Sequence, residues 1–313
     1  MSRKLILLPL LIALIIQVVF GQVTEGEARL RKQNTESSEG WKKGGVMAVT
    51  LTQTSLTNWA AGGQNSLSIN ELLSVFANYK KGKNIWDNSL DIGYGVLKQG
   101  KNSDFIKTDD KFDFLSKYGR QAYQNLYYAA LLNFKTQLTI GKDYATDTKI
   151  SNFLAPAYLL AALGMDYKPN SYFSAFAAPF TGKITIVNDQ QLADAGAFGV
   201  DPGEKSKSEF GGYVRVIYTR SDFTPEILQN LALTSKIDLF SNYLSEPQNI
   251  DVSWETQIVF KVNQYVSVNL NTHLLYDDDI MIGIDNNADG VIDESGPRTQ
   301  FKEILGIGFS YNF

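Results

Sequence analysis

Apolar and polar residues alternate with a period of two along most of the chain after residue 40. The segment 250–262 shows this most clearly, with mostly apolar side chains at even positions and mostly polar ones at odd positions: Ile250, Val252, Trp254, Thr256, Ile258, Phe260 and Val262 against Asp251, Ser253, Glu255, Gln257 and Lys261. Successive side chains of a β-strand point to opposite faces, so this alternation is typical of strands with one apolar and one polar face. Since no helical periodicity is sustained, the pattern predicts an all-β protein.

About twelve segments follow this pattern, some of them weakly: 46–53, 66–80, 86–96, 111–118, 126–140, 153–167, 172–187, 210–219, 231–240, 250–262, 266–276 and 301–313. The connections between them alternate in length. The short ones are 81–83, 119–124, 169–171, 222–226 and 263–264, and the longer ones are 55–65, 98–110, 141–149, 188–208, 245–249 and 277–298. This order predicts an up-and-down antiparallel transmembrane β-barrel with short periplasmic turns, longer extracellular loops and both termini on the periplasmic side.

Composition is compatible with such a barrel. Hydrophobic residues make up 44% of the chain, and the mean hydropathy is −0.16. A membrane barrel places apolar residues at every second position, so its average hydropathy resembles that of a water-soluble protein. The 16 Tyr and 18 Phe residues suit aromatic girdles at the two membrane interfaces. A soluble secreted β-protein of similar composition is the alternative.

The N-terminal segment has the features of a secretory signal peptide. Arg3 and Lys4 precede an apolar run over residues 5–16, and Val19, Phe20 and Gly21 lead to a polar residue. A basic start, a short apolar core and small residues before a polar position predict a signal peptide over residues 1–21. Residues 22–40 are polar and predict a disordered tail. The barrel is then expected over residues 41–313.

The last strand ends the chain on an aromatic residue. Apolar side chains alternate along it, and its final ones are Phe309, Tyr311 and Phe313. This strand resembles the C-terminal targeting strand of bacterial outer-membrane barrels. The resemblance implies that Phe309, Tyr311 and Phe313 form an assembly signal for the barrel-assembly machinery. It also implies a location in the bacterial outer membrane, in contact with its lipid.

Three further stretches carry a resemblance to one family: WKKGG at 41–45, LTNWAAGG at 56–63 and GPRTQFKE at 296–303. Together with the leader that ends in VFGQ, they resemble a Bacteroidetes-type family of predicted outer-membrane proteins whose function is undefined. The resemblance covers nearly the whole chain after the leader. It implies the barrel fold and the outer-membrane location, and it implies no activity.

Charge and cysteine content exclude several classes of function. The net charge is −4 and no basic segment dominates, which argues against nucleic acid as a partner. The absence of cysteine excludes disulfides, a thiol nucleophile and a lipid anchor on cysteine. With His273 as the only histidine, a metal site built from several histidines is excluded as well.

An acidic stretch in the last long connection is similar to a calcium loop of the EF-hand type. Asp285, Asn287 and Asp289 occupy its first, third and fifth positions, the carbonyl of Val291 its seventh, and Asp293 its ninth. The twelfth position carries Gly296, where a bidentate Glu is usual. The spacing therefore predicts a weak Ca²⁺ site in an extracellular loop, and a solvated acidic turn without an ion is the alternative.

His273 and the inward-facing charges are the remaining candidates for chemistry. A barrel lipid hydrolase needs its Ser and His on the lipid-facing wall, whereas His273 shares its parity with Asn269 and Asn271 and is expected inside. The other inward positions carry charges of both signs: Asp91, Lys135, Arg215, Lys236, Asp238, Asp251, Glu255, Lys261 and Lys302. Such a row fits a narrow polar pore or a lumen filled by ion pairs.

Three functions follow, and the first two are non-enzymatic. One is a narrow channel for small polar solutes. The second is a structural or surface-interaction barrel with a filled lumen and no transport. A barrel lipid hydrolase is the third, and it is disfavoured because no nucleophile motif surrounds His273. The oligomeric state is left open.

Overall fold

The computed structural model describes residues 39–56, 64–100, 103–144, 147–263, 266–284 and 293–312. Twelve antiparallel strands close into one barrel in the ring order β1-β16-β13-β12-β11-β10-β9-β8-β5-β4-β3-β2. They are β1 (Gly40–Thr54), β2 (Ser66–Lys81), β3 (Asn84–Gln99), β4 (Phe105–Tyr123), β5 (Leu126–Thr136), β8 (Ala157–Tyr167), β9 (Phe173–Ile186), β10 (Ser206–Arg220), β11 (Leu231–Asn242), β12 (Ile250–Lys261), β13 (Val266–Tyr276) and β16 (Gln300–Asn312). The all-β fold and the number of strands are as predicted. The predicted signal peptide, nearly all of the tail and Phe313 lie outside the described residues.

The alternation of side chains separates the two faces of the barrel wall. On β12, Trp254 is 45% exposed on the outer face, whereas Asp251 and Glu255 face the lumen. The same outward exposure of apolar side chains recurs around the ring, as at Leu163, Phe180 and Leu305. An apolar outside and a charged inside are what a barrel in lipid requires.

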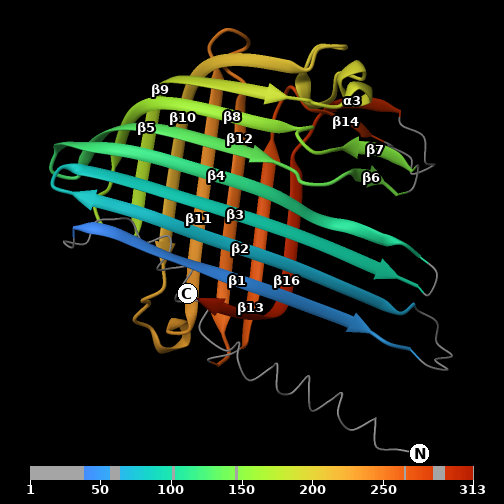
Figure 1. The fold of residues 1–313 in the computed structure, drawn as a ribbon, viewed down its shortest axis with the longest axis horizontal. Helices are drawn as coiled ribbons and strands as arrows, with labels where there is room; N and C mark the ends of the chain where they lie inside the picture. The colour runs from blue at the N-terminus through green and yellow to red at the C-terminus, as the bar shows by residue number, and fades with distance from the viewer. Residues whose placement is uncertain are drawn as a thin grey trace, which may run out of the picture.

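The ring is closed by the predicted last strand. Backbone pairing joins β16 to β1 from Val46↔Asn312 to Thr50↔Gly308, while its other edge pairs with β13. In Figure 1, β1 to β4 run side by side across the view, and β11, β12, β13 and β16 run steeply behind them. Phe309 and Tyr311 therefore take part in closing the ring through their backbones, opposite Val49 and Met47.

The longer connections lie at one end of the barrel, and the helix and short strands within them are at the upper right in Figure 1. They contain the hairpins β6–β7 (Gly141–Asp143 and Thr148–Ser151) and β14–β15 (Met281–Ile284 and Glu294–Pro297), the helix α3 (Gln190–Asp194) and the 3₁₀ turn η1 (Ala197–Gly199). We call this the loop end and the opposite one the turn end. Among the described residues, no helix is long and apolar enough to cross a membrane.

Two details of the predicted connections are wrong. The turn-end connection 221–230 has ten residues and holds the 3₁₀ turn η2 (Glu226–Leu228), so it exceeds the loop-end connection 243–249, which has seven. Pro225 has no N–H for a strand ladder, which is one reason why the chain turns here. In addition, β5 ends at Thr136, because the Asp110 carboxylate accepts the backbone N–H groups of Leu138 and Thr139, at 2.8 and 2.9 Å.

A glycine permits close strand contact where β8 and β9 change register. The register shifts between Leu163 and Met165, and a Cβ on Gly164 would lie 2.0 Å from the carbonyl oxygen of Ala177. The close contact between β8 and β9 therefore depends on the absence of a side chain at residue 164. On the same wall, a Cβ on Gly182 would meet nothing within 4 Å.

We predict that Gly164→Ala lowers the free energy of unfolding by about 1–3 kcal/mol, as expected for an atom forced into a close-packed position. Urea unfolding in detergent micelles, followed by the shift between folded and unfolded bands on a gel, measures the change. Gly182→Ala is the matched control and is expected to unfold like the wild type. Equal stability of the two variants would contradict the close contact at Gly164.

Candidate functional site: the charged lumen

An ion pair joins opposite walls of the barrel through the lumen. Lys111 on β4 and Glu255 on β12 are 144 residues apart in sequence, yet Lys111 Nζ lies 3.0 Å from Glu255 Oε2. Five strands separate β4 from β12 in each direction around the ring, so the two strands face each other across it. Their side chains therefore meet in the middle of the lumen.

Further ion pairs surround this crossing. Lys236 on β11 lies 3.0 Å from Glu255 and 3.7 Å from Asp113 on β4, so it links three strands. Arg215 on β10 holds Asp238 on β11 through two hydrogen bonds, of 2.5 Å from Nε and 2.8 Å from Nη2. Arg215, Lys236 and Asp238 are all buried. We call Lys111, Asp113, Arg215, Lys236, Asp238 and Glu255 the crossing layer.

A second set of charges lies nearer the turn end. Lys168 follows the last residue of β8, and its Nζ lies 2.5 Å from Asp87 on β3 and 3.5 Å from Asp166. Asp166 also lies 2.7 Å from Lys117 Nζ on β4 and accepts a hydrogen bond of 2.9 Å from Ser174. Lys168 is 1% exposed and Asp166 is fully buried. These charges are therefore shielded from water and depend on one another.

A cavity of about 360 Å³ lies beside the crossing layer and reaches toward the loop end. Its walls include Lys111 and Glu255, the aromatic rings of Tyr158 and Phe240, and Asp277 after β13. We call it the vestibule. The other cavities described along the lumen are smaller, at about 170 and 120 Å³. The cavity of about 170 Å³ shares Lys111, Glu255 and His273 with the vestibule, so the Lys111–Glu255 pair lies where these two spaces meet.

His273 faces the lumen as its parity predicts, and it lines the vestibule. Its Nε2 lies 3.0 Å from Ser253 Oγ on the neighbouring strand. Sequence reasoning missed this pair, because the two residues lie diagonally on β12 and β13. Glu255 is the direct cross-strand neighbour of His273, but its carboxylate is held by Lys111 and Lys236. His273 is therefore a hydrogen-bonded histidine of the lumen. Among the described residues, no carboxylate is hydrogen-bonded to its imidazole ring.

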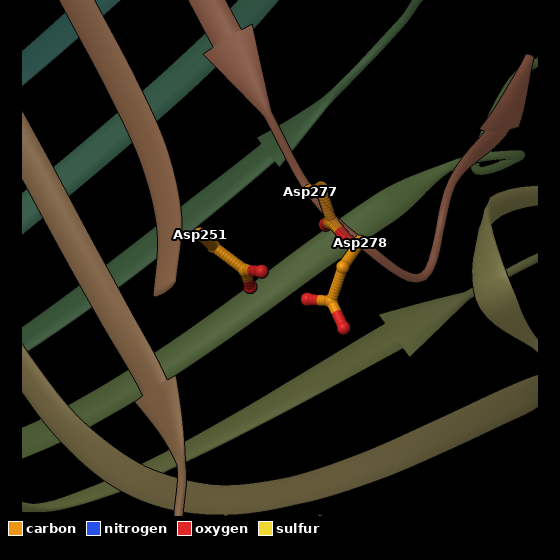
Figure 2. Close-up of side chains that lie close together, drawn as sticks. All are labelled: Asp251, Asp277 and Asp278. Atoms are coloured by element: carbon orange, nitrogen blue, oxygen red, sulfur yellow. The ribbon is translucent and has the colours of Figure 1, made fainter. Parts of the chain in front are cut away.

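Three aspartates converge at the loop-end mouth of the vestibule. Figure 2 shows Asp251 at the start of β12 and Asp277 and Asp278 beyond β13, and one carboxylate oxygen of each lies within 4.8 Å of the others. Lys183 Nζ lies 2.7 Å from Asp251 and 3.7 Å from Asp277. An ammonium group of the protein thus already balances part of this charge, and Asn249 donates a hydrogen bond of 2.8 Å to Asp278.

The predicted calcium loop lies mostly outside the described residues. This holds for Asp285, Asn287, Asp289 and Val291, while Asp293 directly precedes β15. The described strands before and after it in sequence, β14 and β15, pair with each other, and Ile284 is opposite Glu294. Calcium binding therefore stays a prediction.

A second polar centre fastens the loop end. Asp189 caps the helix α3 by accepting the N–H of Leu192 at 3.2 Å, and its other oxygen lies 2.6 Å from Lys149 Nζ and 2.9 Å from Asn152 Nδ2. The hydrogen bond from Lys149 contributes most to lowering the pKa of Asp189 to about 2. Leu192 packs below it in a small apolar core with Ala155, Val187, Ala193 and Val200.

A family model without an assigned function matches part of the chain. Residues 51–141 match a family described as a protein of unknown function, DUF3078. No curated protein matches the chain. The family match names no group of organisms, so the Bacteroidetes-type attribution stays a prediction.

Several solved barrel structures are distantly similar in fold. The translocator domain of the autotransporter NalP from Neisseria meningitidis is 10% identical over 93% of this chain and 98% of that one, with a TM-score of 0.35. The COG4313 outer membrane channel from Pseudomonas putida F1 is 8% identical over 89% and 97%, with a TM-score of 0.39. Outer membrane phospholipase A from Escherichia coli is 10% identical over 92% and 98%, with a TM-score of 0.36. The closed ring, apolar outer face and charged lumen of this chain are the features of a transmembrane β-barrel.

We predict that Lys168→Met lowers the free energy of unfolding by about 3–5 kcal/mol, because it removes the closest cation of Asp87 and one of the two cations beside the buried Asp166. Urea unfolding in micelles measures the loss. Lys142→Met serves as the control, since Lys142 forms a similar pair with Asp147 in an exposed loop and is expected to change stability little. Similar losses in both variants would contradict the importance of burial.

We predict that the loop end loosens in acid. A carboxyl group whose folded-state pKa is lowered stabilises the fold above its unfolded pKa of 3.8, and this contribution is lost as pH falls toward about 2. The protection of the Leu192 N–H, which is its exchange rate relative to that of an unstructured amide at the same pH, should fall between about pH 4 and pH 2. In Asp189→Ala, which removes the oxygen that accepts this N–H, the protection should already be low at pH 7. Equal protection of that N–H in both proteins at pH 7 would refute the capping role.

Proposed function

We propose that the protein is an integral outer-membrane barrel whose lumen is closed by its own side chains, and which presents an ordered set of loops at one end. The observation that carries the proposal is the contact between Lys111 and Glu255, which joins opposite walls at 3.0 Å. A narrow channel would need an uninterrupted polar passage at this level. The crossing layer occupies that space with ion pairs, of which Arg215–Asp238 is buried and Lys111–Glu255 is partly exposed to the lumen.

Energetics support a filled lumen. Burying charges is costly unless each finds a close partner, and removing one partner of a buried pair is strongly destabilising. Asp238 has two hydrogen bonds from Arg215 and one of 2.7 Å from the hydroxyl of Tyr213. To open a pore, these side chains would have to leave their partners. The closed arrangement is therefore the stable one.

The loops provide the part of the molecule that can interact outside the membrane. The cap built on Asp189 joins the α3 connection to the β6–β7 hairpin through Lys149, and Lys207 on β10 pairs with Asp279 in the connection after β13. Both ion pairs therefore join parts of the loop end that are far apart in the sequence. We propose that the loop end acts as a preformed surface on a closed barrel, and that His273 serves as a lumen hydrogen-bonding group without a catalytic role.

The proposal is tested by recording currents across a planar lipid bilayer. The refolded wild type is expected to show no steady conductance. The triple variant Lys111→Ala/Lys236→Ala/Glu255→Ala removes the side chains that cross the lumen together with their mutual charges, and is expected to conduct. Heat-dependent migration on a gel confirms that both proteins are folded barrels. A wild-type conductance equal to that of the triple variant would favour the narrow channel.

A further inference from the structure

An apolar groove of about 550 Å³ runs along the outer wall of the barrel over β4, β5, β8, β9 and β10. Small residues form its floor, among them Ala130, Ala161 and Gly182, and larger ones rise beside it, including Leu163 and Phe180. Leu163 is 60% exposed and Phe180 is 63% exposed. The space above Gly182 is open, since an added Cβ would meet nothing within 4 Å.

If the proposed function is right, lipid covers the face that holds the groove. The inference rests on this membrane location and on no other part of the proposed function. An apolar hollow does not hold ordered water, because water needs polar partners. A hollow in the lipid-facing wall must therefore be filled by hydrocarbon. Because its floor is built of small residues on neighbouring strands, an acyl chain can approach the wall more closely here than over the adjoining side chains.

A row of aromatic residues marks the membrane interface at the turn end of this wall. Trp41, Tyr79, Trp86 and Tyr118 are direct cross-strand neighbours on β1 to β4, and the ring centroids of Trp41 and Tyr79 are 5.1 Å apart. Such rows are typical of the level at which lipid headgroups lie. Tyr118 also lines the groove, so the groove reaches this level.

An arginine stands at the same place. Arg120 is exposed and follows Tyr118 by two positions on β4, so it shares its outward face, one step nearer the turn end. Tyr128, its direct neighbour on β5, is 63% exposed. Among the described residues, no carboxylate forms an ion pair with Arg120. A guanidinium binds phosphate oxygens in a two-pronged geometry, and here it ends an apolar groove at headgroup level.

We propose that this wall holds one phospholipid molecule of the leaflet at the turn end, with an acyl chain in the groove over Gly182 and its phosphate on Arg120 beside Tyr128. The apolar lining selects the chain and the cation selects the phosphate. Both features lie on one wall. The site is independent of the vestibule and of the crossing layer, because it uses only outward-facing residues.

Native mass spectrometry of the full chain in a mild detergent tests the site, with 1-palmitoyl-2-oleoylphosphatidylglycerol as the added lipid. The wild type is expected to retain one lipid molecule. Arg120→Gln is expected to lower the apparent affinity about tenfold, because it removes a charge-assisted contact with the phosphate. Gly182→Leu is expected to remove most of the bound lipid, because the new side chain extends into the groove from a position where an added Cβ meets nothing within 4 Å.

Two control variants make the same kinds of change elsewhere on the outer face. Lys43→Gln removes an exposed cation beside Trp41, and Val49→Leu enlarges an exposed apolar residue on β1. Both are expected to bind lipid like the wild type. Gel migration before and after heating reports for every variant whether the barrel is folded, and fractionation reports whether it is in the outer membrane.

The outcomes separate the two proposals. A folded, membrane-embedded wild type that retains no lipid, or variants at Arg120 and Gly182 that retain as much as the controls, would overturn the lipid site alone. A wild type that is soluble without detergent would overturn the membrane location first. A wild-type dimer that Gly182→Leu dissociates would show that a second copy of the chain covers the groove, which also overturns the lipid site.

Discussion

Charges inside a ring of strands need partners, and in this barrel some of these partners come from the opposite wall. A barrel of about eight strands is filled by side chains, whereas sixteen or more leave a water channel, so twelve lie between these cases. Lys111 and Glu255 are long enough to meet at 3.0 Å across the ring. This contact fixes the positions of Lys236 and Asp113, and through them the crossing layer. The two small cavities and the vestibule are the spaces that remain.

The same strands carry two different surfaces. On β12, Glu255 completes the crossing layer while Trp254, its neighbour in sequence, is exposed on the outer face. A shift of register by one residue would place the carboxylate in lipid and the indole in the lumen. Backbone pairing, lumen charge and outer apolar surface are therefore coupled, which explains how a chain of moderate hydropathy specifies one arrangement. On the outer wall, the same pleat places Arg120 and Tyr118 on one face with the groove.

The period-two pattern predicted the twelve strands, their faces and the inward position of His273, because these depend only on neighbouring residues. It could not predict that Lys111 meets Glu255, since this contact depends on ring order and barrel diameter. Lys168 was missed because it lies in a turn and its side chain returns into the lumen. Asp251 lies on β12, while Asp277 and Asp278 follow β13, and the pairing of Val252 with Tyr276 brings them together; the alternation alone does not give this register. The length of the 221–230 connection was underestimated because a 3₁₀ turn has no period-two signature.

The central claim is that side chains from opposite walls meet in the lumen. Solid-state NMR on the protein in lipid bilayers can measure the dipolar coupling between the ¹⁵N-labelled ammonium of Lys111 and the ¹³C-labelled carboxyl carbon of Glu255. Lys111→Arg and Glu255→Gln assign the two signals. A strong coupling, corresponding to the 3.0 Å contact between Nζ and Oε2, is the predicted result. The absence of any measurable coupling in a folded barrel would show that the lumen is open at this level and would contradict the account.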